Sequence, residues 1–506
     1  MSTASRRPGL IIALVALGIY ALIPTRDFYW DGVGFAQAIE TGGGSPGALL
    51  NPNHLIYTLA GYLVWKGLMA VGIALRALFV LQALNAVFAA AAVYLAWDII
   101  RKLTGSLPHA NWGSLLFAFS AQWWKFSSDA DAYIPSIFFL LVSFRWIMTA
   151  QQPRHYAAAA AHSVAMLFHQ LAFFFFPVAL AGLLVRPELR SGEKRKALLD
   201  ALSYGALATT LTGTVYWLAY RFVRPYVGSR GFFDWITVYS PDAALPIALY
   251  HRFRYSIRGT LRLFFGGRIN RIEPDAVMAA GVAISVLALA AVTIRMLRSR
   301  RHAETAPPGH ASPYRAWLAA NRPTICWILA YMAFLFFWLP QNVFYRMFYL
   351  PPLLFMLLSL PALRAHRVMP VALLATIVCA WNFNVLIYPH SRIETNEVLS
   401  CALTNRSEWK PGTTILYGRS HTDLWLISYF NPQVEWTGLP AVEVAEVERQ
   451  RLRAAQNARP LWLEGMGYDE LASTPAGQAW LARHVNEPAS HLHVTPAHNI
   501  RYYKIQ

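Results

Sequence analysis

Long apolar runs separated by short basic loops constrain this chain more than any other feature. Of its 506 residues, 56% are hydrophobic and only 14% are charged. A helix that crosses a bilayer needs about 20 consecutive apolar residues, and runs close to that length recur between positions 9 and 388. The sequence therefore predicts an α-helical polytopic membrane protein.

Counting the apolar runs predicts about eleven transmembrane helices. The segment 155–186 is too long for one upright helix, and a single crossing would place the basic loop that follows it outside. We therefore expect two short helices there, hinged near His169-Gln170. The remaining predicted spans are 9–24, 77–98, 110–126, 133–150, 198–222, 275–295, 323–340, 343–363 and 368–388.

The basic residues predict the orientation of these helices. The formal net charge is +18, but the Lys and Arg residues fall largely in short loops, so the charge indicates topology and contact with membrane lipid, and no nucleic acid. With the N-terminus in the cytoplasm, five basic loops lie on the cytoplasmic side, while the region 221–275 and the C-terminus lie outside. These loops are 101–102, 145–154, 186–196, 295–322 and 364–367. We expect the protein in the cytoplasmic (inner) membrane.

After about residue 389 the composition turns polar and strands alternate with helices. This alternation predicts a small extracytoplasmic α/β domain at 389–506, after a membrane domain at 1–388. The expected strands are 414–417, 434–437, 461–463, 491–494 and 501–505, and the expected helices are 423–430, 442–457 and 468–484. The region contains no Gly-rich phosphate loop, nucleophile elbow or Cys and His pair at metal-ligand spacing.

Asp31 is the first candidate for a catalytic residue. It lies in residues 27–35, Asp-Phe-Tyr-Trp-Asp-Gly-Val-Gly-Phe, directly after the first apolar run. A carboxylate among aromatic residues at the outer membrane boundary is either a solvated loop acid or a functional group. Asp27, at the start of the same stretch, is a candidate for substrate binding.

The stretch Trp-Asp-Gly-Val-Gly-Phe-Ala-Gln resembles the first outer loop of protein O-mannosyltransferases, where an aromatic-Asp-Glu-x-x-Phe pattern follows the first membrane helix. The resemblance implies that Asp31 is the general base. Gly32 stands where that family has Glu, whereas other members of the GT-C superfamily of lipid-linked-sugar glycosyltransferases keep the Asp alone. The order of motifs over roughly residues 10–200 is also similar to that of bacterial relatives of the mannosyltransferases.

A second outer turn carries Asp129 and Asp131 at the entrance to a predicted helix. Either acid could cap that helix, a role in which Asp is favoured. The functional alternatives for these acids are a metal ligand, an acceptor contact or a brace for a cation. A bound divalent cation is therefore one alternative, and no other cofactor is predicted. In the resemblance, Asp131 corresponds to an acidic residue before a Tyr. His54 and His169 are either hydrogen-bonded for structural reasons or part of the site.

Two basic segments are candidates for holding a phosphate. Residues 250–265 alternate basic and aromatic side chains, as interfacial amphipathic helices do, and include Arg258 and Arg262. The segment 340–352 looks like the Arg-x-x-Tyr-Leu-Pro entry to a late GT-C helix, which points to Arg346 with Tyr345 beside it. A guanidinium suits bidentate phosphate binding. The alternative for Arg346 is an interfacial side chain that extends to the lipid headgroups.

These observations predict a glycosyltransferase of the cell envelope. It would move a sugar from a polyprenyl-phosphate donor to a glycan, lipid or protein acceptor at the outer membrane face. Phosphate is already a good leaving group, so one carboxylate base suffices and a paired acid is not required. A transporter or flippase of a lipid-linked sugar, or an inactive relative that only binds one, are the rival hypotheses.

Overall fold

The computed structural model describes residues 6–148, 153–185, 194–238, 247–268, 275–300, 313–364, 368–485, 490–493 and 499–506. Contacts divide the chain into two compact units. Unit 1 comprises Met1–Pro24 and Ala38–Pro389, and unit 2 comprises Thr25–Gln37 and His390–Gln506. Each unit is described by itself.

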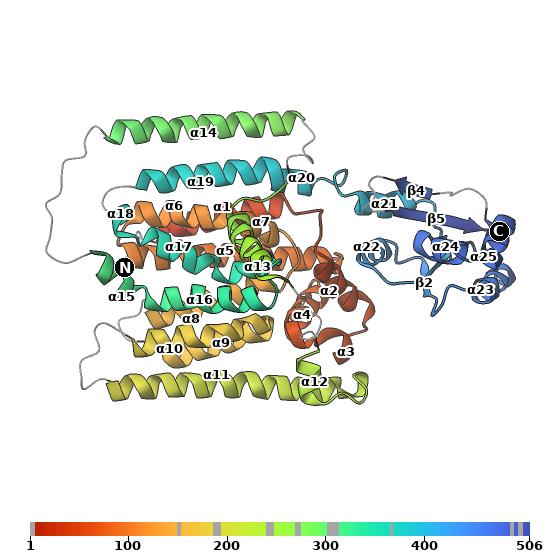
Figure 1. Ribbon diagram of the computed structural model, residues 1–506, viewed down its shortest axis with the longest axis horizontal. Coiled ribbons are helices and arrows are strands. Elements are labelled where there is room, and N and C mark those ends of the chain that lie inside the picture. The colour runs from red at the N-terminus through yellow and green to blue at the C-terminus, as the bar shows by residue number, and fades with distance from the viewer. Residues whose placement is uncertain are drawn as a thin grey trace. The chain divides into compact units, whose positions relative to one another are not determined.

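Unit 1 is a bundle of helices that lie side by side (Figure 1). Within it α6 packs on α5 and α19, α14 packs on α19, and α9 packs on α8 and α11. The bundle helices are α1 (Arg7–Leu22), α5 (Ala77–Thr104), α6 (Leu107–Ala118), α8 (Tyr133–Met148), α9 (His155–Phe168), α10 (Phe176–Leu184), α11 (Lys194–Val223), α14 (Ala276–Arg300), α16 (Arg322–Phe337), α17 (Leu350–Leu358) and α19 (Val368–Asn382).

Shorter elements connect the bundle helices. They are α2 (Trp30–Thr41), α3 (Pro46–Leu49), η2 (Pro52–His54), α4 (Tyr57–Ala70), α7 (Ala121–Ser127), η3 (Gln170–Phe175), η5 (Arg224–Tyr226), α12 (Phe232–Ile236), α13 (Leu249–Phe264), α15 (Pro313–Ala320), η8 (Phe344–Tyr349), α18 (Pro361–Arg364), η9 (Phe383–Ile387) and α20 (Tyr388–Ser391). Of these, α2 begins in unit 2 and continues into unit 1.

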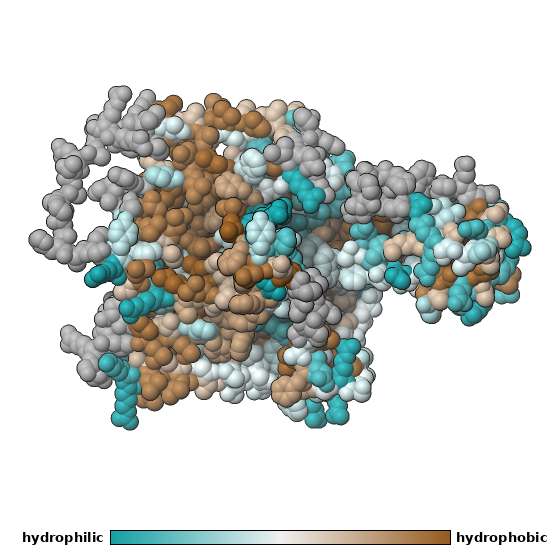
Figure 2. All heavy atoms as spheres, viewed as in Figure 1, coloured by the Kyte–Doolittle hydropathy of each residue, from teal (hydrophilic) through white to brown (hydrophobic). Residues whose placement is uncertain are grey.

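Unit 1 belongs to an integral membrane protein, and apolar side chains gather over much of the face of its helices that Figure 2 shows. Among the described residues three helices are long and apolar enough to cross a membrane, namely Ala77–Thr104, Ala276–Ile294 and Val368–Ser391. A pair bent by 66°, Tyr314–Ala320 with Arg322–Phe337, makes a fourth if it counts as one span. The figure of eleven spans stays a prediction. Residues 149–152, 186–193, 301–312 and 365–367 of the expected basic loops lie outside the described residues.

One expected span is interrupted, and the predicted hinge is confirmed. The run 110–126 is two helices, because Ser120 adopts an extended conformation and turns its hydroxyl back to the Leu116 carbonyl at 2.6 Å. His169 is likewise extended, between α9 and η3. After it α10 runs back, so that Gly182 packs against the end of α8.

Unit 2 contains a five-stranded sheet in the order β2-β1-β3-β5-β4. The β1 strand pairs in parallel with β2 and β3, whereas β3–β5 and β5–β4 are antiparallel. The strands are β1 (Thr414–Tyr417), β2 (Glu435–Gly438), β3 (Leu461–Glu464), β4 (Ser490–His493) and β5 (Asn499–Ile505). The helices are α21 (Glu397–Asn405), α22 (Thr422–Phe430), α23 (Val444–Gln456), α24 (Gly465–Ala472) and α25 (Pro475–His484).

The α/β pattern expected after residue 389 agrees with these elements with two exceptions: α21 was not expected, and one expected helix is divided. The run 468–484 is split, because the Thr474 hydroxyl caps a new helix through the Gly477 N–H and Pro475 occupies its first turn. Position 494 of the expected fourth strand lies outside the described residues. The core of unit 2 is formed by apolar side chains of the central strands and of α23 to α25, including Leu416, Leu463 and Trp480.

The aromatic stretch around Asp31 is part of unit 2. The Arg26 N–H donates to the His390 carbonyl at 2.6 Å, and Asn396 Nδ2 donates to the Arg26 carbonyl at 2.6 Å. The rings of Phe28 and Phe430 have centroids 5.9 Å apart. Segment 25–37 therefore packs on residues that follow it by more than 350 positions in the chain.

Candidate functional site

Asp31 occupies the first turn of α2, where an acidic side chain is favoured by the helix dipole. The side chain is half-buried, and this burial raises the pKa of the carboxyl to about 7. A carboxyl with a pKa near neutrality is suited to accept a proton at the pH of the reaction. The neighbouring residue is Gly32, so this turn holds one carboxylate rather than a pair.

Asp27, the other acid of segment 25–37, contacts Thr25 and His390 of unit 2. Its Oδ2 lies 3.0 Å from Nδ1 of His390. Its N–H contacts the Thr25 hydroxyl at 3.2 Å and the His390 carbonyl at 3.2 Å. These contacts hold the chain one turn before Asp31, so the structure supports a positioning role for Asp27.

Three of the predicted residues of unit 1 come together in one aromatic cluster. The rings of His54 and His169 meet edge to face with centroids 4.7 Å apart. Tyr133 lies 4.9 Å from His169, and Tyr345 lies 5.7 Å from it. Tyr345 also meets Tyr133 at 5.4 Å. We call His54, Tyr133, His169 and Tyr345 the histidine cluster.

Both histidines of this cluster are buried. His169 Nδ1 accepts a hydrogen bond from the Leu171 N–H at 3.0 Å, so the ring proton of the neutral form is on Nε2. That nitrogen is buried and has no hydrogen-bond partner within the described ranges. Burial lowers the pKa of His54 to about 3, which keeps this ring neutral. The cluster can therefore offer neutral hydrogen-bonding groups, with His169 Nε2–H as a donor.

Asp129 and Asp131 are both buried in the turn before α8. Asp131 Oδ1 accepts at 2.9 Å from the N–H of Tyr133, the first residue of α8, and so supplies a partner to one of the N–H groups that a helix start leaves without one. Asp129 Oδ1 accepts from the Ala130 N–H at 2.8 Å. The bond from Tyr133 at the start of α8 agrees with the capping alternative for Asp131, and the functional alternatives for both acids stay predictions.

Asn85 organises this turn, and sequence reasoning missed it. Its Nδ2 donates to the carbonyls of Asp129 and Asp131 at 2.9 and 2.7 Å, while its Oδ1 accepts from the Tyr57 hydroxyl at 3.2 Å. The sequence does contain a signal for it, because an Asn in the middle of a long apolar helix needs polar partners. Asn85 therefore fixes the conformation of the acidic turn from a neighbouring helix.

Arg346 is fully buried, which disagrees with the alternative of an interfacial side chain that extends to the lipid headgroups, while its role at the phosphate stays a prediction. Its Nε donates to the Asn342 carbonyl at 3.1 Å and its Nη2 to the Pro340 carbonyl at 2.6 Å. Its Nη1 donates to the Tyr349 hydroxyl at 2.9 Å. The physical reason is that the break between α16 and η8 leaves carbonyls without helical partners, and a guanidinium with five N–H groups supplies several of them.

The amphipathic helix α13 packs over Arg346. An added Cβ at Gly259 would overlap the Arg346 side chain, and the Thr260 hydroxyl lies 2.9 Å from that of Tyr349. On the same helix Arg258 is exposed and Arg262 is half-buried. Desolvation lowers the pKa of Arg262, with further contributions from the charges of Arg258 and Arg268. Cationic groups therefore gather along this helix next to η8.

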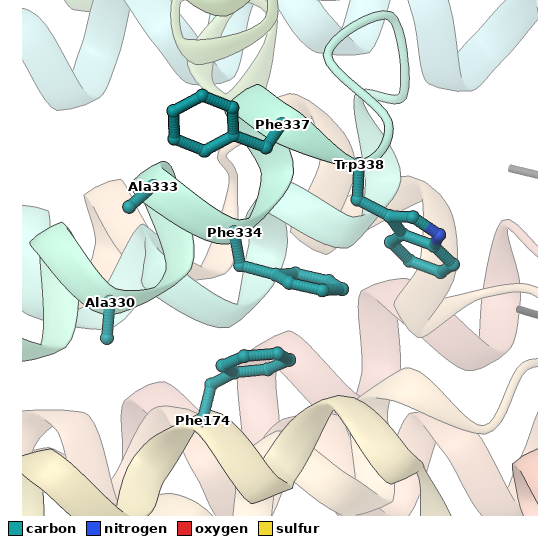
Figure 3. A pocket seen from close by; sticks show the side chains of 6 residues that line it. All are labelled: Phe174, Ala330, Ala333, Phe334, Phe337 and Trp338. Atoms are coloured by element: carbon teal, nitrogen blue, oxygen red, sulfur yellow. The ribbon is translucent and has the colours of Figure 1, made fainter. Parts of the chain in front are cut away.

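An open apolar hollow of about 500 Å³ lies between η3 and α16 on unit 1. Figure 3 shows the Phe174 ring facing that of Phe334, with Trp338 at one end. Trp338, which lines the hollow, also stacks on Tyr345 of the histidine cluster with ring centroids 5.6 Å apart. The lining residues are Phe174, Ala330, Ala333, Phe334, Phe337 and Trp338.

No metal site is apparent in the part of the chain that the structure describes. There, no group of three or more His, Cys, Asp or Glu side chains has an arrangement that could hold a metal ion. The two acids before α8 lie close together in sequence, but their carboxylates bond to separate backbone N–H groups.

Comparison with solved structures identifies the fold. The chain matches ArnT from Cupriavidus metallidurans bound to undecaprenyl phosphate with a TM-score of 0.59 and 12% sequence identity, over 100% of this chain and 98% of that chain. ArnT is a GT-C glycosyltransferase, and this chain has a GT-C-like fold. Such low identity shows the fold alone.

Two further structures match less well. Apo ArnT from the same organism has a TM-score of 0.47 at 12% identity, over 98% of this chain and 97% of that chain. The S. cerevisiae protein O-mannosyltransferase Pmt1-Pmt2 complex bound to the sugar donor has a TM-score of 0.35 at 13% identity, over 44% and 34%. No family model and no curated protein matches the chain.

Proposed function

We propose that this protein is a membrane glycosyltransferase that moves a sugar from a polyprenyl-phosphate donor to an acceptor hydroxyl at the outer face of the cytoplasmic membrane. The observation that carries the proposal is the likeness of the fold, over 100% of this chain and 98% of that chain, to ArnT bound to undecaprenyl phosphate. Asp31, a carboxyl whose pKa lies near 7, supports the chemistry.

In this reaction Asp31 takes the proton from the acceptor hydroxyl. The acceptor oxygen bonds to the sugar carbon that carried the phosphate, and the bond from that carbon to the phosphate oxygen breaks. Polyprenyl phosphate departs with the bonding electrons, so no acid is needed to protonate it. Asp27 positions the segment that carries Asp31.

Unit 1 supplies groups suited to the donor. Arg258 and Arg262 are cations at the surface of α13 that could contact the phosphate. Arg346 makes three hydrogen bonds to the η8 segment and the residues before it, and two of its five N–H groups are left for the phosphate. The open apolar hollow in Figure 3 suits isoprenoid units, because it is lined by aromatic and Ala side chains.

The remaining predicted residues are assigned to the substrate as proposals of the same kind. His54, His169 and Tyr345 face one another in the histidine cluster, where His169 Nε2–H is a free donor for an oxygen of the sugar. Asp129 and Asp131 shape the adjoining turn.

Product analysis tests this function directly. Purified protein in nanodiscs is incubated with polyprenyl-phosphate sugars labelled in the sugar, together with envelope lipid and glycan extracts as acceptors. We expect release of unlabelled polyprenyl phosphate and label in an acceptor. Movement of the intact labelled donor across proteoliposome membranes, without any release of polyprenyl phosphate, would replace the transferase proposal with the flippase.

A further inference from the structure

The parallel part of the sheet in unit 2 has the topology of a binding crevice. The chain passes from β1 to β2 on one side, and β3 pairs with β1 on the other. In open α/β sheets, ligands bind outside the carboxyl ends of strands at such a switch point. Here the loop after β1 leads into α22 and the end of β3 leads into α24.

Two polar side chains face each other at this edge. His421, at the start of α22, has Nε2 3.6 Å from Oε1 of Glu464, the last residue of β3. This separation is too long for a hydrogen bond. Glu464 is only 4% exposed, so a carboxylate and a ring nitrogen lie together in a buried place without bonding directly.

The other atoms of both side chains are already used. His421 Nδ1 accepts from the Leu424 N–H at 3.3 Å, which leaves the proton of the neutral ring on Nε2. Glu464 Oε2 accepts from the Gly467 N–H at 3.3 Å. His421 Nε2 is buried and has no hydrogen-bond partner among the residues described. The pair thus presents one unused donor beside one acceptor.

A hydroxyl group matches this pair. Its oxygen can accept from His421 Nε2–H while its proton is donated to Glu464 Oε1, and an oxygen set to one side of the 3.6 Å gap reaches both atoms. A phosphate has no proton-donating group to offer when fully ionised, and the carboxylate repels it. The chemistry therefore favours a neutral, hydroxyl-bearing ligand.

Aromatic rings stand next to the pair. Trp425 is one helical turn after His421 in α22, and its Nε1 donates to the Ser420 hydroxyl at 2.7 Å. Trp30 has its ring centroid 5.9 Å from that of Trp425 and is 43% exposed. Flat aromatic surfaces with a few oriented polar groups are typical of sites that bind small ligands.

We propose that His421, Glu464 and Trp425, with Trp30, form a carbohydrate-binding site that holds the acceptor glycan. The proposal rests on the proposed glycosyltransferase function and extends it to the substrate class of the acceptor. It also connects two parts of unit 2, because Trp30 of this site directly precedes Asp31, the proposed base. The hydroxyl that His421 and Glu464 bind anchors the acceptor, while a different hydroxyl reacts.

Saturation-transfer NMR on the full-length protein in nanodiscs tests this site, with methyl α-glucoside, methyl α-galactoside and methyl α-mannoside as probes. Two variants keep the helix caps but remove the facing pair. His421→Asn retains a capping oxygen, and Glu464→Gln retains an acceptor for Gly467. The matched control is Glu435→Gln, an exposed carboxylate at the opposite end of the parallel strands that pairs with Arg459.

We expect at least one glycoside to bind wild type and Glu435→Gln alike, and to bind His421→Asn and Glu464→Gln about tenfold more weakly, the loss that follows from about one hydrogen bond. No saturation transfer from any of the three glycosides, equal binding by all variants, or competition by inorganic phosphate would overturn the proposal. Asp31→Asn should bind the glycoside normally yet lose transfer. Glycoside binding by a wild-type protein that never consumes donor would refute the transferase function and leave this site standing.

Discussion

Asp31 combines two properties that a general base needs, namely partial burial and a pKa near the working pH. Only the ionised carboxylate can accept a proton, so the active fraction grows as pH rises towards the pKa. The aromatic residues around Asp31 in the sequence predict that it is a functional carboxylate. Its burial could not be predicted, because the segment that carries it packs on Trp425 and Phe430, which lie far along the chain.

The first prediction is therefore a pH profile. The initial rate of polyprenyl phosphate release should rise about tenfold per pH unit from about pH 5, then level off above about pH 7. The measurement uses saturating donor and acceptor, with protein integrity checked at each pH. A rate that is flat or falling across this range would show that no group with the pKa of Asp31 acts as the base.

For Arg346, too, the sequence predicted that the residue is a candidate but not that its side chain is buried. The Arg-x-x-Tyr-Leu-Pro pattern singles out the residue and its neighbourhood. The side chain is nonetheless buried, because carbonyls of Pro340 and Asn342 and the Tyr349 hydroxyl need donors there. Such pairing depends on where the α16 helix ends, which hydropathy defines only to within a few residues.

At the scale of elements, helix α13 and segment η8 form one packed assembly. Gly259 lets the α13 backbone approach the Arg346 side chain, and Thr260 bonds to Tyr349. Gly259→Ala should therefore lower the free energy of unfolding by about 1–3 kcal/mol through overpacking. Thermal unfolding in detergent measures this effect.

The matched control for that measurement is Gly213→Ala in α11, where an added Cβ meets no atom within 4 Å. This change should be neutral, or stabilising by up to about 1 kcal/mol, since Ala favours helix over Gly. If both variants unfold at the wild-type temperature, α13 does not rest on Arg346 as described.

Length arguments predicted some elements well and missed others. The hinge at His169 follows from two observations. The apolar run is too long for one upright helix, and a single crossing would place the basic loop after it outside the cytoplasm. The breaks at Ser120 and Thr474 were not predicted, because each depends on a local hydrogen bond of a hydroxyl that many continuous helices also contain.

For the whole molecule, composition predicted the membrane class and the α/β character of residues after 389. Composition could not predict that segment 25–37 joins the C-terminal region. A single domain boundary near residue 389 divides the chain into two continuous parts, whereas unit 2 consists of two separate segments. The facing of His421 and Glu464 likewise depends on the parallel pairing of β1 with β3.

Orientation is the prediction at this scale. A reporter fused after Gln506 should be active only outside the cytoplasm, and one inserted at 192–197 only inside it, because basic loops stay in the cytoplasm. Paired reporters that report opposite compartments, such as alkaline phosphatase and a fluorescent protein, give the answer in intact cells. A cytoplasmic C-terminus would contradict both the odd number of spans and an outer-face reaction.

The most direct test of the central claim compares wild type with Asp31→Asn in the polyprenyl phosphate release assay. Asn keeps the size and hydrogen bonding of the side chain but cannot act as a base, so the rate should fall by about 10²- to 10⁴-fold while thermal stability and donor binding are retained. Glu435→Gln, which neutralises an exposed carboxylate of unit 2, should keep the wild-type rate. A folded Asp31→Asn protein that turns over at the wild-type rate would contradict the account.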